Sequence, residues 1–239
     1  MTAGFFTHPY RVPHPRLDPQ WIATVHLALV RAFERIRSEG FDLTAASEDE
    51  ISFKLEDEFM NRLIPDSDGD LDLSFILDVS RESASANHDQ SSIGRKPDFV
   101  FRLNRRELCR SHNRVQDCLY AECKPVGRAH RLNAHYCAVD KSTSGIERFV
   151  SGAYAHSMEQ GMMIAYVRDE FQITSDLADA LKQPKARTGL GEPSALSCVT
   201  EPNGAHSQGL YLTTHQRNFP WPDGNAATPI DLYHSWHEC

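Results

Sequence analysis

The sequence contains no long apolar run. No segment of the 239 residues approaches the roughly 20 consecutive apolar residues that cross a bilayer. The first 21 residues contain four prolines and several basic side chains, where a signal peptide would have an apolar core. These absences argue against a membrane protein and an exported protein. We therefore expect a cytoplasmic protein with no membrane partner.

The chain also lacks a CxxC motif. Its six cysteines are expected to be reduced, because no export signal accompanies them. A zinc site can be assembled on paper from one region that contains Cys109, His112, Cys118, Cys123, His135 and Cys137. Their spacing matches no compact zinc knuckle, and two of them fall on a predicted strand, so a structural zinc site is the weaker interpretation.

Positive charge is scarce overall but concentrated in one segment. The net charge is −8, which argues against a protein that coats nucleic acid nonspecifically. Residues 95–131 nevertheless contain ten Lys or Arg against four acids, a local balance of +6 that leaves −14 for the rest. A basic face on an acidic body favours a protein that grips a polyanion at one place. The alternative is a solvated basic hairpin.

Apolar periodicity predicts a single α/β domain. Helices are expected over residues 21–39, 48–64, 146–160 and 173–182, and strands over 71–79, 96–103, 117–126, 161–167 and 209–214. Ser47 and Glu50 have the spacing of a capping box at the start of the second helix. We expect residues 1–46 to form an N-terminal extension and helix, 47–170 the core, and 171–239 a helix, an irregular loop (183–207), a strand and a short terminal segment (229–237) that complete the domain.

Two predicted strands hold charged groups among apolar neighbours. Asp98 lies in the run 96–101, and Glu122 and Lys124 lie in the run 119–124. Glu122 and Lys124 are two residues apart on a strand, so their side chains leave the same face. If Asp98 lies across from them, two carboxylates converge and repel each other unless a cation lies between them. Oxygen ligands of this kind suit Mg²⁺ or Mn²⁺.

The pair Pro97-Asp98 and the triplet Glu122-Cys123-Lys124 resemble the motif of the PD-(D/E)XK nuclease superfamily over about residues 48–167. The resemblance implies a restriction-endonuclease-like αβββαβ core, in which a central mixed sheet is flanked by helices. It also implies Mg²⁺ or Mn²⁺ as cofactor, metal ligation by Asp98 and Glu122, and a catalytic role for Lys124 toward the attacking water. The alternative for these three residues is an ion pair across a half-exposed sheet.

A third acid commonly comes from the preceding helix in these nucleases. We choose Glu50 as this catalytic residue and metal ligand, because it stands one residue before the apolar series that opens at Ile51. Asp57 and Glu58 are the alternatives, and ordinary helix surface is the other interpretation of all three acids.

Four arginines are candidate nucleic-acid contacts. Arg105, Arg106 and Arg110 belong to the basic insert between the two halves of the motif, and Arg148 falls on the helix after it. Each could instead be a solvated surface charge.

The sequence therefore predicts a metal-dependent DNA endonuclease of a restriction or anti-phage defence system, activated or targeted by a partner protein or by homo-oligomerisation. One alternative with the same active site is an RNA-cleaving or repair nuclease. The other alternative is a noncatalytic nucleic-acid-binding or assembly subunit with a degenerate nuclease fold.

Overall fold

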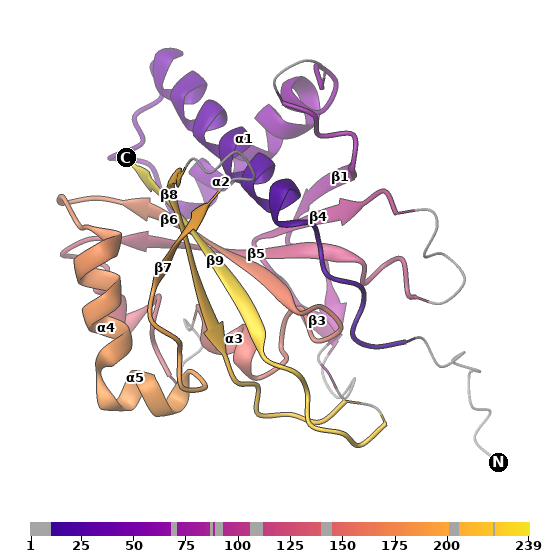
Figure 1. The fold of residues 1–239 in the computed structure, drawn as a ribbon. Helices are drawn as coiled ribbons and strands as arrows, with labels where there is room; N and C mark the ends of the chain where they lie inside the picture. The colour runs from indigo at the N-terminus through magenta and orange to yellow at the C-terminus, as the bar shows by residue number, and fades with distance from the viewer. Residues whose placement is uncertain are drawn as a thin grey trace.

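A mixed β-sheet runs through the middle of the protein (Figure 1). The computed structural model describes residues 11–67, 71–86, 88, 93–105, 112–139, 145–200, 206–221 and 223–239. Within these residues the main sheet has seven strands in the order β1-β4-β5-β6-β9-β8-β7. The strands are β1 (Ile76–Arg81), β4 (Phe99–Leu103), β5 (Cys118–Val126), β6 (Gln160–Val167), β7 (Ser197–Thr200), β8 (His206–His215) and β9 (Ile230–Glu238). A separate pair joins β2 (Ser85–Ala86) to β3 (Ile93–Arg95).

The strand directions place a parallel centre between antiparallel flanks. β5, β6 and β9 are parallel neighbours, whereas β4 is antiparallel to β1 and β5, and β8 is antiparallel to β9 and β7. Every residue of β5 and β6 is buried. This burial is typical of central parallel strands, because helices or loops cover both faces.

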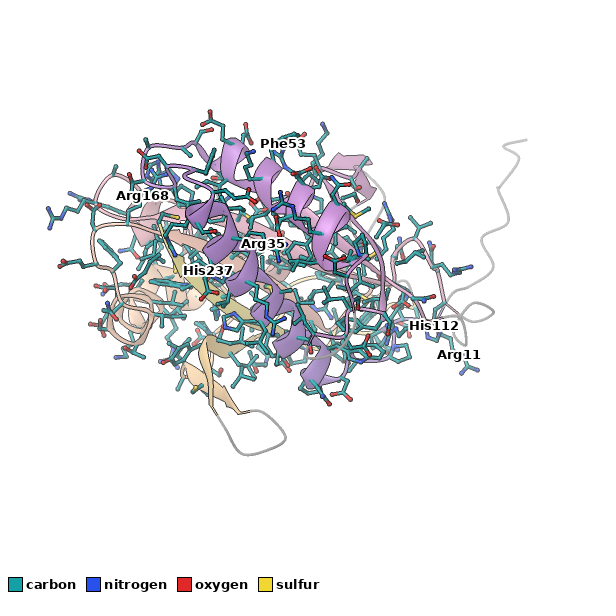
Figure 2. The ribbon with its side chains drawn as sticks, turned by 90° about the horizontal axis from the view of Figure 1, so that it is seen from above. Arg11, Arg35, Phe53, His112, Arg168 and His237 are labelled. Atoms are coloured by element: carbon teal, nitrogen blue, oxygen red, sulfur yellow. The ribbon has the colours of Figure 1, made fainter. Side chains whose placement is uncertain are left out.

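Two N-terminal helices cover one face of the sheet. Helix α1 (Pro19–Ser38) begins after Asp18, whose carboxylate accepts a hydrogen bond from the Gln20 backbone N–H. Helix α2 (Glu48–Glu58) continues into a π-helical turn (Phe59–Leu63). Figure 2 looks onto this layer, with Arg35 on α1 and Phe53 on α2. Both helices begin and end close to the residues that the apolar spacing predicts.

Shorter elements complete the fold. A 3-10 turn (Leu132–Ala134) and helix α3 (Glu147–Val150) lie between β5 and β6 in the chain, and a π-helical turn (Ile173–Leu177), α4 (Ala178–Lys182) and α5 (Pro184–Gly189) follow β6. None of the helices in the described ranges is long and apolar enough to cross a membrane.

Helix α3 is much shorter than the helix predicted over residues 146–160. The chain turns at Gly152, where φ is +72°, and again at Ala155, where φ is +50°. A Cβ atom at residue 152 would lie 2.6 Å from a ring carbon of Phe219. Apolar spacing alone does not reveal this close approach, so the predicted helix was too long.

The C-terminal region differs most from the sequence prediction. Residues 229–237 were expected to form a short terminal segment, but β9 is an interior strand of the sheet, between β6 and β8 (yellow in Figure 1). The segment expected to be an irregular loop contains α5 and β7. His234, Ser235 and His237 are typical of an exposed strand, yet all three are buried because hydrogen bonds satisfy their polar atoms.

A directed chain of hydrogen bonds runs from β8 through β9 to Tyr136. The carbonyl of Leu190 can only accept, so Nδ1 of His215, 2.6 Å away, carries the proton. Nε2 of His215 then accepts from the Thr213 hydroxyl at 2.7 Å. The Thr213 oxygen accepts from Nε2 of His234 at 2.7 Å, and Nδ1 of His234 accepts from the Tyr136 hydroxyl at 2.8 Å. Each imidazole therefore has one defined neutral tautomer.

We expect nitrogen NMR to find His215 as the Nδ1–H tautomer and His234 as the Nε2–H tautomer, both neutral from about pH 8 to about pH 5.5. The reason is burial, which lowers the pKa of His215 to about 4 and that of His234 to about 3. In the unfolded chain both imidazoles titrate near 6.5. Their neutral forms therefore stabilise the fold fully above that pH, and this contribution is lost as the pH falls toward about 4. Protonation of either ring above about pH 5.5 would contradict the assigned chain.

Candidate active site

The pairing of β4 with β5 brings the two halves of the sequence pattern together. Phe99 lies opposite Ala121 in this antiparallel pair, so Asp98 lies at the start of β4 beside Glu122 on β5. An oxygen of Asp98 accepts a hydrogen bond of 2.6 Å from the Cys123 backbone N–H. This bond fixes the carboxylate of Asp98. It also satisfies the Cys123 backbone N–H, which lies past the point where β4 begins and pairs with β5.

Lys124 lies among three carboxylates. Its ammonium nitrogen is 2.8 Å from Oε1 of Glu122, 3.4 Å from Oε1 of Glu48 and 3.7 Å from Oδ2 of Asp98. The same ammonium donates to the Cys123 carbonyl at 2.6 Å. Burial disfavours the charged form of Lys124, but the three carboxylates outweigh it and raise the pKa of Lys124. The lysine is therefore a fixed cation.

Glu122 is the most deeply buried charged group of this cluster, with 0% of its surface exposed. Its Oε1 accepts from Lys124 and, at 2.8 Å, from Arg148, while its Oε2 has no hydrogen-bond partner among the described residues. Burial, followed by the negative charge of Asp98, raises the pKa of Glu122 to about 8. One buried carboxylate oxygen is thus left for a further positive group.

Arg148 on helix α3 donates a hydrogen bond to the Glu122 carboxylate. Arg148 also hydrogen-bonds to the Tyr154 hydroxyl at 2.5 Å, and that hydroxyl donates to the Lys96 carbonyl at 2.7 Å. The guanidinium lies over the Tyr154 ring, 5.3 Å from its centroid. Arg148 therefore links Glu122 on β5, through Tyr154, to the residues just before β4.

The acid that α2 brings to the cluster is Glu48, whereas the sequence singled out Glu50. Glu50 accepts hydrogen bonds from the Ser47 backbone N–H at 2.8 Å and from the Ser47 hydroxyl at 2.7 Å, in the capping box that the sequence predicts. Its carboxylate is exposed and engaged there. Glu48 stands at the first helical position and reaches Lys124. Burial raises the pKa of Glu48, and the charge of Lys124 opposes this shift.

The two alternatives to Glu50 have other positions. Asp57 accepts a hydrogen bond from Asn61 on the exposed side of α2. Glu58 is buried but forms ion pairs with Arg35 and Arg62. The carboxylates that pair with Lys124 in the described part of the chain are those of Glu48, Asp98 and Glu122.

Arg105 is placed away from the cluster. It is 7% exposed, forms a salt bridge with Asp117 and donates to the Pro15 carbonyl at 2.8 Å. His14 and His112 lie beside this pair, and Figure 2 shows His112 on the opposite side of the molecule from Arg168. The geometry of Arg105 is that of a structural ion pair. Arg106 and Arg110 fall outside the described residues.

A cleft of about 490 Å³ opens onto the cluster. Glu48, Asp98, Lys124 and Arg148 line it. Three further side chains that the sequence did not single out also line this cleft, namely His130, His135 and Arg168. The sequence signal for His130 and His135 is the loop that starts at Gly127, shortly after Lys124, and contains several Arg and His residues.

The donor set fits a divalent cation. Three carboxylates (Glu48, Asp98 and Glu122) face only two cations (Lys124 and Arg148), so the fully ionised cluster carries excess negative charge. Oxygen donors with solvent access suit Mg²⁺ or Mn²⁺. Among the described residues no three His, Cys, Asp or Glu side chains already form a metal-ligand group, because the Lys124 ammonium lies between these carboxylates.

No protein-family model matches the chain, and no curated protein or solved structure shows a significant similarity to it. Function is therefore inferred from the side chains themselves.

Alanine at Glu48 and at Glu50 should have separate effects. We expect Glu48→Ala to weaken Mn²⁺ binding at least about tenfold in isothermal titration calorimetry, because one carboxylate of the cluster is lost. Glu50→Ala should leave Mn²⁺ affinity unchanged but cost about 1 kcal/mol of unfolding free energy in urea, because the capping box is lost. The reverse pattern would show that Glu50 is the metal ligand.

Proposed function

We propose that this protein is a divalent-metal-dependent nuclease that hydrolyses phosphodiester bonds, with DNA as its substrate. The observation that carries the proposal is the convergence of Glu48, Asp98 and Glu122 around the ammonium of Lys124 at the bottom of a cleft. A buried carboxylate with an unpaired oxygen is costly for a fold to keep. A site that binds a cation offers a reason to keep it.

The order of elements supports the same proposal. Helix α2, strands β1, β4 and β5, helix α3 and strand β6 come in this order along the chain, with the separate β2-β3 pair between β1 and β4, and the four strands are neighbours in the sheet. This is the αβββαβ order of the restriction-endonuclease-like core that the motif resembles. Asp98 at the start of the second of these strands, and Glu122 and Lys124 on the third, also fit that resemblance.

Each residue of the cluster has a defined task in this proposal. Glu48, Asp98 and Glu122 would hold Mg²⁺ or Mn²⁺. When bound, such an ion polarises a phosphate oxygen and lowers the pKa of a water molecule. Lys124 keeps its proton beside these carboxylates, so it acts as a hydrogen-bond donor that orients the attacking water and offsets charge on the phosphate.

Arg148 acts as a positioning residue in the proposed reaction. By donating to Oε1 of Glu122 it leaves Oε2 as the oxygen available to a cation. Its guanidinium also lines the cleft, where it can contact a substrate phosphate. A role in restriction or anti-phage defence, and activation by a partner or by self-association, stay predictions from the sequence resemblance.

The two lysines of the motif region provide a matched test. Lys124→Met should reduce cleavage of plasmid DNA at least about 100-fold with Mg²⁺ or Mn²⁺, because the donor to the water and phosphate is lost. Lys96→Met should stay within about twofold of the wild type, since the Lys96 side chain is 55% exposed and its ion pair with Glu82 lies at the surface. EDTA should abolish cleavage by every active variant.

Metal binding separates a catalytic defect from a folding defect in this test. The Lys124 ammonium competes with any cation for the same carboxylates, so Lys124→Met should bind Mn²⁺ at least as tightly as the wild type while it fails to cleave. Equal cleavage by Lys124→Met and the wild type would refute the proposed function. Parallel assays on single-stranded RNA decide between DNA and RNA, and binding of nucleic acid without metal-dependent cleavage would favour a noncatalytic subunit.

A further inference from the structure

The loop of residues 127–135 connects the end of β5 to the segment before α3 and has a fixed shape. Gly127 and His130 exchange two backbone hydrogen bonds, of 3.3 and 3.1 Å. At the other end of the loop, the Gly145 N–H donates to the His135 carbonyl at 3.1 Å. The loop is therefore held at both ends by backbone bonds, so its side chains have limited freedom before any ligand arrives.

The same loop is attached to the turn after β6. The Arg128 backbone N–H donates to the Asp169 carboxylate at 2.7 Å. A Cβ atom at Gly127 would lie 2.8 Å from an oxygen of that carboxylate. Only glycine allows this approach without displacing Asp169. The contact holds the loop at the rim of the candidate active site.

The loop separates two clefts. His130 and His135 line the cleft of the candidate active site, with their ring centroids 5.5 Å apart. Arg128 and Arg131 are exposed and line an adjoining cleft of about 680 Å³, whose opposite wall comes from Phe171 and α4. The loop is thus a shared wall that presents imidazoles to one cleft and guanidinium groups to the next.

The charges along this wall suit an anion. With the described residues, neither Arg128 nor Arg131 forms a salt bridge. The two acids of the second cleft are already engaged, since Asp176 accepts from the Gln172 backbone N–H at 2.6 Å and Asp179 pairs with Lys182 at 3.0 Å. Two arginines without a carboxylate partner, next to two imidazoles, are typical of phosphate contacts.

We propose that the 127–135 loop binds the phosphates that flank the cleaved bond. His130 and His135 contact the nucleic-acid backbone on the active-site side, and Arg128 and Arg131 contact phosphates farther along the same strand. This inference rests on the proposed nuclease function. The proposal predicts that a polynucleotide binds more tightly than a mononucleotide, because a chain that spans both clefts makes contacts that a mononucleotide lacks.

The test measures binding and cleavage separately. Affinity is followed by fluorescence anisotropy of a labelled single-stranded oligonucleotide in EDTA, and cleavage is followed as KM and kcat with Mn²⁺. Arg128→Ala/Arg131→Ala should weaken binding at least about tenfold and lower the slope of log affinity against log salt by about 1.4, because two phosphate contacts are lost on a single strand. Arg128→Lys/Arg131→Lys keeps both charges and should retain most of the affinity and the slope.

The histidine pair should act on substrate binding and leave the chemical step intact. His130→Ala/His135→Ala is expected to raise KM about tenfold with kcat within about twofold, since these contacts are made equally in the ground state and the transition state. His156→Ala, a half-buried histidine that lines neither cleft, serves as the matched control and should behave like the wild type.

The outcomes distinguish the two proposals. If the wild type cleaves but both loop double variants keep wild-type affinity, salt slope and KM, the loop assignment is wrong and the nuclease proposal stands. If the wild type binds without cleaving and the arginine double variant loses that binding, the loop is a phosphate site and the nuclease proposal is wrong. If the wild type neither binds nor cleaves nucleic acid, both are wrong.

Discussion

The ionic contacts of the Glu122 carboxylate are the constraint on which this end of the sheet depends. Glu122 lies on a strand buried along its whole length, and burial raises its pKa to about 8 even beside Lys124 and Arg148, so its ionised form depends on these two cations. Lys124 comes from the same strand, whereas Arg148 comes from α3. The position of Glu122 therefore constrains three other parts of the fold. These are α3 with Arg148, the first turn of α2 with Glu48, and the start of β4 beside Asp98.

The capping box explains why the sequence singles out Glu50 while the structure places Glu48 beside Lys124. Asp98 and Glu122 could be singled out because each is a charged residue beside a short apolar run, whereas the register that brings them together is known only from the pairing of β4 with β5. The spacing of Ser47 and Glu50 also predicts the capping box that forms. One carboxylate cannot both close this box and reach Lys124. Glu50 closes the box, and Glu48, two residues earlier in the same helical turn, reaches Lys124.

The two N-terminal helices could be predicted because each buries one apolar face, which sets a clear period in the sequence. Strands β1, β4, β5 and β6 could be predicted from short apolar runs, and β5 and β6 are buried along their whole length. Strand β9 could not, because its pattern is interrupted by His234, Ser235 and His237. These residues are buried through long-range partners: Ser235 hydrogen-bonds to His26 on α1 at 2.7 Å, and His237 stacks on Phe33 with ring centroids 4.4 Å apart. Sequence periodicity contains no information about such partners.

Side chains of β9 also hydrogen-bond to Tyr136, which lies next to the candidate site. Tyr136 accepts a hydrogen bond from Trp236 of β9 at 3.2 Å and donates to His234 of the same strand. Strand β9 therefore fixes Tyr136, the residue that directly follows the 127–135 loop. The Tyr136 carbonyl accepts from the Ile146 N–H at 3.1 Å, just before α3 and Arg148. Strand β9 thereby helps to position His130 and His135, which line the cleft, and Arg148, which hydrogen-bonds to Glu122. The buried polar groups of β9 cost desolvation, and in return they give the cleft a defined shape.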